Sequence, residues 1–144
     1  MTIWFDMDGT IADLYGIEDW LNYLINENPY PYINAKTLLN FSLLARLLNK
    51  VQTKGFQIGI ISWTSKVGST DYNEKVTLAK MEWLAKHLKS VHWDEIKIVN
   101  YGTNKFEECG GGILFDDEIG NREAWGENAF EPTMIIEKLK ELIG

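Results

Sequence analysis

Cysteine, proline and positive charge are all scarce in this chain of 144 residues. The single cysteine, Cys109, excludes an internal disulfide and a multi-cysteine metal site, so we expect a reducing, cytoplasmic environment. Lys and Arg number 14 against 21 Asp and Glu, and the net charge of -7 argues against an extended nucleic-acid surface. No apolar run approaches the roughly 20 residues of a membrane span, and the first residues lack a basic signal-peptide segment, so we expect no membrane partner.

Short apolar segments alternate along the chain with segments of helical periodicity. Runs of apolar residues predict strands over 3–5, 56–61, 96–99 and 113–115. Apolar positions spaced by three and four predict helices over 18–28, 35–54, 74–88 and from Pro132 onward. This alternation is typical of βαβ units. We therefore expect an α/β protein with three α/β/α layers, a Rossmann-like parallel sheet and one domain over 1–144.

Three segments between these elements lack a clear periodicity. The polar stretch 66–73 and the glycine-containing stretch 101–112 are predicted to be loops. Pro29 and Pro31 are predicted to break the chain after the helix over 18–28.

Polar residues directly follow several of the predicted strands. Asp6 and Asp8 follow the first strand, Ser62 ends the second, and Asp116 and Asp117 follow the fourth. Because the carboxyl ends of parallel strands meet at one edge of a sheet, we expect these side chains to converge. Carboxylates gathered in this way repel one another unless a cation lies between them, and Mg²⁺ prefers such oxygen ligands. The alternative is that the first acidic pair only stabilises a turn, but the second pair favours the metal site.

The segments around these residues resemble motifs of the haloacid dehalogenase superfamily. Residues 6–13, Asp-Met-Asp-Gly-Thr-Ile-Ala-Asp, are similar to its first motif, 58–62 to its second and 113–117 to its fourth. Their order and spacing agree over nearly the whole chain. The resemblance implies a core of that superfamily and, because Asp8 is present, an Mg²⁺-dependent phosphomonoester hydrolase.

The resemblance also implies a role for each of these residues. Asp6 would be the nucleophile that forms an aspartyl-phosphate, and Asp8 would act as general acid and then general base. Asp6, the backbone carbonyl of Asp8 and Asp117 would hold Mg²⁺, with Asp116 beside them, and Ser62 would hydrogen-bond a phosphoryl oxygen. Around the substrate we expect, in addition, Gly9, Thr10, Trp63 and Thr64.

The lysine that neutralises the phosphate has more than one candidate. Lys105 is favoured, because it follows the third predicted strand and a loop at that position lies at the expected edge of the sheet. Lys80 begins a lysine-aromatic segment that resembles a helix of the 5′(3′)-deoxyribonucleotidase branch. Lys66, just past the second motif, is a third candidate.

A short helical insert over 14–34 is the only space for a cap over the site, so the site should be open. This insert and the residue after Ser62 are rich in aromatic residues: Tyr15, Trp20, Tyr23, Tyr30, Tyr32 and Trp63. Such rings could stack on a nucleobase, which favours a nucleotide monophosphate or another small phosphate ester as substrate. The alternative is that they are ordinary core and surface aromatics.

Two other functions remain compatible with the sequence. One is a non-catalytic phosphate-binding or regulatory module on the same fold. The other is a phosphoacceptor regulator similar to bacterial receiver domains, although those domains carry their acceptor on a central strand rather than after the first one. The oligomeric state is left open.

Overall fold

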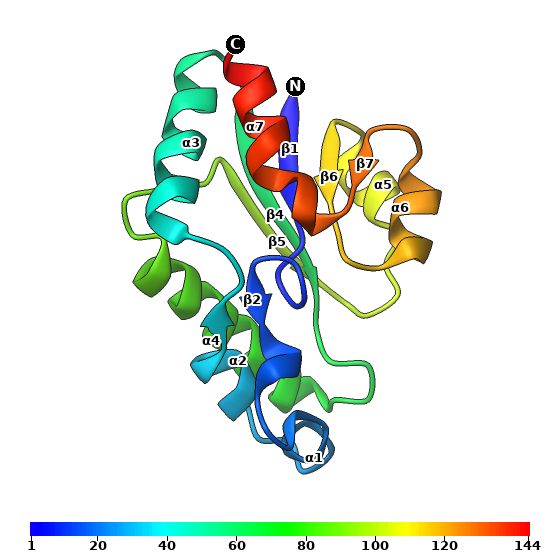
Figure 1. The fold of residues 1–144 in the computed structure, drawn as a ribbon. Helices are drawn as coiled ribbons and strands as arrows, with labels where there is room; N and C mark the ends of the chain where they lie inside the picture. Colours follow the sequence, from blue (N-terminus) through cyan, green and yellow to red (C-terminus); the bar gives the residue numbers. More distant parts are fainter.

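A parallel sheet of five strands forms the middle of the protein (Figure 1). The computed structural model describes all residues from 1 to 144. The strands lie in the order β5 (Glu95–Val99), β4 (Gln57–Trp63), β1 (Thr2–Phe5), β6 (Ile113–Phe115) and β7 (Ala129–Phe130). The chain moves from β1 to one edge and later returns to the other side of β1. This reversal is the position at which α/β sheets bind ligands, beyond the carboxyl ends of the strands.

Successive residues of the central strands pack against two different helical layers. Ile3 and Phe5 belong to one apolar cluster, whereas Trp4 belongs to another with Trp125. The first cluster is completed by α3 (Phe41–Thr53), α7 (Ile135–Ile143) and the second half of α4 (Thr70–His87). On the opposite face lie α5 (Lys105–Cys109) and α6 (Ile119–Trp125). The result is the expected Rossmann-like arrangement of three layers. None of the helices is both long enough and apolar enough to span a membrane.

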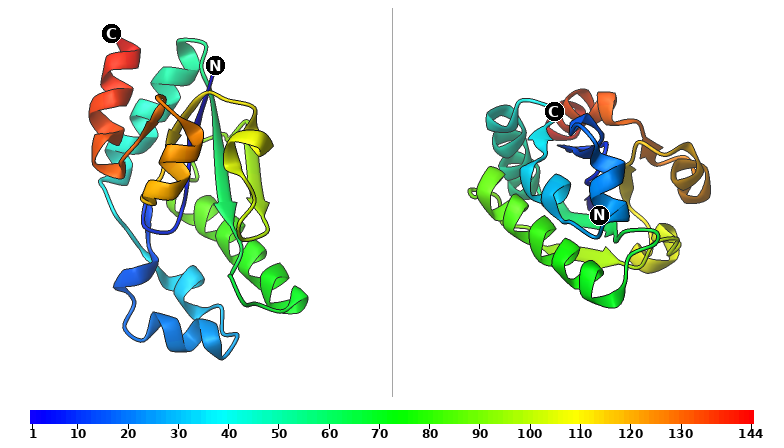
Figure 2. Two further views of the ribbon diagram at one scale, coloured as in Figure 1. Left: turned by 90° about the vertical axis from the view of Figure 1, so that its right-hand side faces the viewer. Right: turned by 90° about the horizontal axis from the view of Figure 1, so that it is seen from below.

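Residues 14–34 extend beyond the carboxyl ends of the strands, next to α4 (Figure 2). They form η1 (Leu14–Gly16), α1 (Trp20–Ile25) and α2 (Tyr30–Asn34). Leu14 and Tyr32 pack with Tyr72, Val76 and Ala79 of the first half of α4, in a cluster separate from the main core. The insert therefore rests on α4 rather than on the sheet.

Helix α3 begins later than the apolar pattern predicted. Its first turn is capped by Asn40, whose side chain accepts a hydrogen bond from the amide of Leu43 at 3.1 Å. Leu38, which has helical spacing in the sequence, instead donates its amide to the carbonyl of Ile11 at 3.0 Å. The preceding residues form a short antiparallel pair, β2 (Ala12–Asp13) with β3 (Lys36–Thr37).

Some segments predicted to be loops contain helices, because polar side chains cap them. Ser69 accepts a hydrogen bond from the amide of Tyr72 at 3.1 Å, so α4 begins at Thr70. Asn104 accepts one from the amide of Glu107 at 3.0 Å, so α5 begins at Lys105. The proline-containing segment forms α2, since proline is tolerated in the first turn of a helix.

Gly59 of β4 leaves the space into which the Trp4 ring packs. A Cβ atom at position 59 would lie 2.5 Å from Cζ3 of that ring. We predict that Gly59→Ala lowers the free energy of unfolding by about 1–3 kcal/mol, because overpacking must displace the ring or the strand. Gly120→Ala is the control, since its Cβ would meet open space. Urea denaturation measures both variants, and equal unfolding free energies would contradict the prediction.

Candidate functional site

The loop after β1 is folded around one backbone carbonyl. The Met7 oxygen accepts hydrogen bonds from the amides of residues 10–12, each at 3.0 Å. This tight path requires a φ of 80° at Gly9, a left-handed conformation that glycine adopts without strain. A Cβ atom at Gly9 would also collide with the carboxylate of Asp117. Gly9 is thus needed to let the first acidic loop approach the second.

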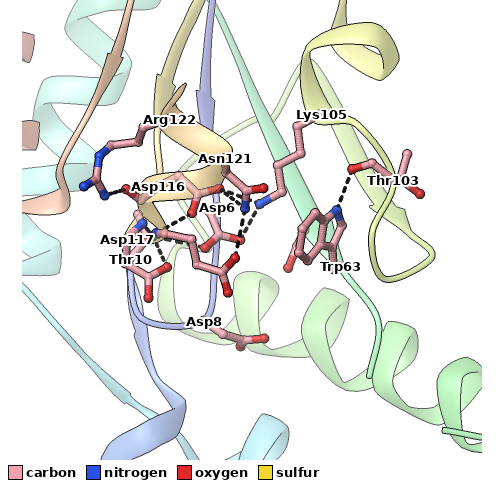
Figure 3. A network of polar contacts seen from close by, with 12 residues as sticks. Asp6, Asp8, Thr10, Trp63, Thr103, Lys105, Asp116, Asp117, Asn121 and Arg122 are labelled. Atoms are coloured by element: carbon pink, nitrogen blue, oxygen red, sulfur yellow. Dashed lines mark hydrogen bonds and ion pairs between the residues drawn. The ribbon is translucent and has the colours of Figure 1, made fainter. Parts of the chain in front are cut away.

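One ammonium group joins the carboxylates at the ends of β1 and β6 (Figure 3). Lys105 Nζ donates to Asp6 Oδ1 at 3.0 Å and to Asp116 Oδ2 at 2.6 Å. Lys105 is only 4% exposed and Asp116 is fully buried, so water does not screen these ion pairs. Burial alone would lower the pKa of Lys105, but the two carboxylates outweigh it and raise that pKa. Burial, followed by the charge of Asp6, raises the pKa of Asp116 to about 6.

The hydroxyl of Thr10 connects Asp6 to Asp117. Thr10 Oγ1 lies 3.2 Å from Asp6 Oδ2 and 3.4 Å from Asp117 Oδ1, and it accepts a hydrogen bond from the Asp117 amide at 3.2 Å. Oxygens of Asp6, Asp116 and Asp117 all lie within 4.8 Å of one another. Burial, together with the charge of Asp6, raises the pKa of Asp117 to about 8. Three grouped carboxylates facing one ammonium form an oxygen donor set with excess negative charge, and this set fits the ligand chemistry of Mg²⁺.

Lys80 of α4 makes a second, separate set of contacts. Its Nζ donates to Asp8 Oδ2 at 2.9 Å, to Ser62 Oγ at 2.7 Å and to the Trp63 carbonyl at 2.7 Å. Lys80 is 1% exposed, and its three ammonium protons are all used within the protein. Burial raises the pKa of Asp8, although Lys80 opposes the shift. The two lysines therefore have different partners, and Asp8 lies apart from the three grouped carboxylates (Figure 3).

Helix α6 holds Asp116 in place. Asn121 Nδ2 donates to Asp116 Oδ2 at 3.1 Å, and the Glu118 amide donates to Asp116 Oδ1 at 2.9 Å. Arg122 Nη1 donates to the Asp116 carbonyl at 3.0 Å. These contacts exist because α6 turns back immediately after the acidic pair. No motif or periodicity marks that turn, so only the fold identifies Asn121. The position of Arg122 after Asp117 suggests from the sequence either a surface ion pair or a contact with the site, and the structure shows both an ion pair with Glu131 at 3.7 Å and the bond to Asp116.

A cavity of about 370 Å³ opens above Asp6, Asp8 and Lys105. Ser62, Trp63, Thr64 and Lys66 line it from the end of β4 and the loop that follows, while Asp117 borders it from the turn between β6 and α6. The insert supplies a largely apolar wall that includes Tyr15, Trp20, Leu24 and Tyr32. The cavity thus joins a charged floor to an apolar wall.

The remaining predicted residues lie outside this cavity. Tyr23 and Tyr30 stack on each other, with ring centroids 4.8 Å apart, and do not line it. Gly9 and Thr10 lie behind the acidic floor, where they shape the loop and border a neighbouring hollow. No protein-family model matches the chain, and no curated protein matches it.

The buried position of Lys105 makes its charge important for stability. We predict that Lys105→Met lowers the free energy of unfolding by about 3–5 kcal/mol, because it leaves the carboxylates of Asp6 and Asp116 buried without a cation to balance their charge. Lys97→Met is the control, because Lys97 is more exposed and its nitrogen lies 3.6 Å from Glu95 and 3.7 Å from Glu108. Its loss should cost less than about 1 kcal/mol. Urea denaturation at neutral pH compares the two, and similar losses would refute the prediction.

Proposed function

We propose that the protein is an Mg²⁺-dependent phosphomonoester hydrolase with a core of the haloacid dehalogenase type. The observation that carries the proposal is the buried Lys105 ammonium between Asp6 and Asp116, at the floor of the cavity. An ammonium next to a carboxylate can neutralise an incoming phosphate while the carboxylate approaches phosphorus. The parallel sheet with β1 at its centre supports the assignment of the core. The proposed substrate is a small phosphate ester, with nucleotide monophosphates among the candidates.

The proposed reaction uses Asp6 and Asp8 in two steps. A carboxylate oxygen of Asp6 attacks phosphorus, and an aspartyl-phosphate bond forms while the ester P–O bond breaks. Asp8 gives its proton to the departing alkoxide, which leaves as the alcohol. Asp8 then takes a proton from the water that attacks the aspartyl-phosphate, and inorganic phosphate is released. Burial, the main cause of the raised pKa of Asp8, supports its role as proton donor.

The metal ligands in this proposal are Asp6, Asp117 and the backbone carbonyl of Asp8. Both carboxylate oxygens of Asp116 already accept hydrogen bonds, from Lys105, Asn121 and the amide of Glu118. Asp117 forms no ion pair with any side chain, which favours it over Asp116 as the direct ligand. When bound, Mg²⁺ would neutralise charge on the phosphate and on the carboxylates.

Lys105 is the phosphate-neutralising lysine in this proposal, and Lys80 positions other groups. Lys80 uses all its protons on Asp8, Ser62 and a backbone carbonyl. Because Ser62 Oγ accepts the Lys80 proton, its own hydroxyl hydrogen is available for a phosphoryl oxygen. Lys80 thereby positions both the proposed proton donor, Asp8, and the hydroxyl of Ser62 that would bind the phosphate.

Replacement of the nucleophile tests the reaction. We predict that Asp6→Asn lowers phosphate release from p-nitrophenyl phosphate on the order of 10³-fold or more, because the amide cannot form the aspartyl-phosphate. Asp13→Asn is the matched control from the same motif. Asp13 accepts a hydrogen bond from the Gly16 amide at 3.0 Å, and asparagine can make the same cap. Release by the wild type should require Mg²⁺.

Three outcomes would contradict the hydrolase proposal. Unchanged turnover in Asp6→Asn would exclude Asp6 as the nucleophile. Binding of Mg²⁺ without turnover of a broad panel of phosphate esters would indicate a non-catalytic phosphate-binding module. Labelling by acetyl phosphate that persists for minutes would indicate a phosphoacceptor regulator.

Binding of Mg²⁺ can be tested without turnover. We predict that Mg²⁺ raises the melting temperature, because a ligand that binds only the folded state at about 100 times its Kd adds about 2.7 kcal/mol of stability. Asp117→Asn should remove most of this increase. Glu123→Gln, an exposed acid on α6, should retain it. Thermal unfolding with and without Mg²⁺ measures the effect, and an equal increase in both variants would exclude Asp117 as a ligand.

A further inference from the structure

Two pairs of aromatic rings line the cavity above Asp6. Tyr15 and Trp20 of the insert meet edge to face, with centroids 4.9 Å apart and planes at 79°. Trp63, the last residue of β4, and Tyr101, which follows the neighbouring strand β5, lie 4.8 Å apart at 56°. Each pair comes from a different part of the chain, so the cavity presents aromatic surface from the insert and from the sheet.

Trp63 extends this aromatic surface to Lys105 on the floor of the cavity. Its Nε1 donates to the Thr103 carbonyl at 2.9 Å, which fixes the ring (Figure 3). Lys105 Nζ lies 5.1 Å from the ring centroid. A phosphate held by Lys105 would therefore have an ordered indole beside its ester group.

Some of the polar groups that line the cavity are already bonded within the protein. Trp63 Nε1 is bonded to Thr103, and the Asn121 amide is bonded to Asp116. The Thr64 hydroxyl is enclosed by protein and has no partner. Half of the 20 residues that line the cavity are hydrophobic, so a ligand would be bound in large part by contact with apolar and aromatic surface.

The mouth of the cavity exposes apolar side chains to water. Leu21 and Ile25 of α1 are 53% and 60% exposed, and both line the cavity. Val67, on the loop after β4, is 74% exposed and also lines it. Such a cluster at the rim of a pocket is typical of a ligand-binding surface.

We infer that the substrate is a phosphate monoester whose alcohol carries a planar aromatic group, which the cavity recognises by stacking. This inference rests on the proposed hydrolase function, because the floor of the same cavity receives the phosphate. Attack by Asp6 releases the aromatic alcohol, and water then hydrolyses the aspartyl-phosphate to inorganic phosphate. Because Leu21, Ile25 and Val67 at the mouth of the cavity are apolar, recognition by stacking includes no hydrogen bond from them to the edge of the ring.

A matched series of esters tests the inference. Benzyl, cyclohexylmethyl and ethyl phosphate all release a primary alcohol, so differences in kcat/KM report mainly on binding of the attached group. Benzyl phosphate should exceed ethyl phosphate about tenfold or more, as burial of a phenyl group predicts. It should exceed cyclohexylmethyl phosphate about two- to tenfold, the range expected for aromatic pairs. Equal kcat/KM values for the benzyl and ethyl esters would overturn the inference.

Nucleoside 5′-monophosphates test whether the protein recognises the edge of the base by hydrogen bonds. Without hydrogen bonds to the edge, the different bases should be hydrolysed with kcat/KM values within about tenfold of one another. A preference of 100-fold or more for one base would overturn recognition by stacking alone.

Variants of the insert assign the effect to the cavity wall. Trp20→Ala should reduce the benzyl-to-ethyl ratio of kcat/KM several-fold, and Trp20→Phe should restore most of it. Tyr30→Ala is the control, because this aromatic residue belongs to the same insert but does not line the cavity. An equal change of the ratio in Trp20→Ala and Tyr30→Ala would contradict the role of Trp20.

Failure of the inference can be distinguished from failure of the proposed function. Hydrolysis of ethyl phosphate that gains nothing from a benzyl group would refute the aromatic substrate and leave the hydrolase intact. If no ester is hydrolysed, the hydrolase proposal fails. Calorimetric binding of benzylphosphonate and ethylphosphonate then still tests the wall, and equal affinities would overturn the inference.

Discussion

The contact of Lys105 with Asp6 and Asp116 is the interaction on which the site depends. Three carboxylates meet at the ends of two adjacent strands, where low solvent exposure makes their repulsion strong. The ammonium reduces that repulsion and holds the start of α5 against the ends of both strands. The loop geometry at Gly9, the Thr10 hydroxyl and the turn into α6 all act on the same group of oxygens. A substitution at any of these positions would therefore change the position or the charge environment of the Asp6 carboxylate.

Much of this arrangement could be predicted from the sequence, for physical reasons that concern particular residues. The short apolar runs at 3–5 and 113–115 predict buried strands, and parallel strands bring Asp6 close to Asp116. The helices α5 and α6 were not predicted, because they are too short to show a periodic pattern of apolar residues. They are stabilised by caps and by packing instead. The partners of Lys80 and Lys105 could not be assigned from sequence, since they depend on the path of α4 and on the start of α5.

The floor and the wall of the cavity have different physical characters. The floor contains charges whose partners are fixed by short hydrogen bonds from several elements. The wall consists of aromatic and aliphatic side chains, and it comes largely from one short insert. Charged groups require close positioning, whereas apolar contact is non-directional and tolerates variation. This difference fits a site in which the chemistry is held rigidly and the ligand group is accommodated by surface contact.

The insert packs against the first half of α4 rather than against the sheet. Substitutions that change the shape of the cavity can therefore be distinguished from substitutions that change the charged residues. Substitutions among Tyr15, Trp20 and Leu24 can alter the shape of the pocket without touching the residues that hold Asp116. Tyr32 is different, because its ring lies 5.3 Å from Lys80 Nζ, the group that contacts Asp8. Substitutions that alter which ligand the cavity accepts should therefore occur mainly at the outer residues of the insert. A substitution of Tyr32 should instead require a compensating substitution in α4.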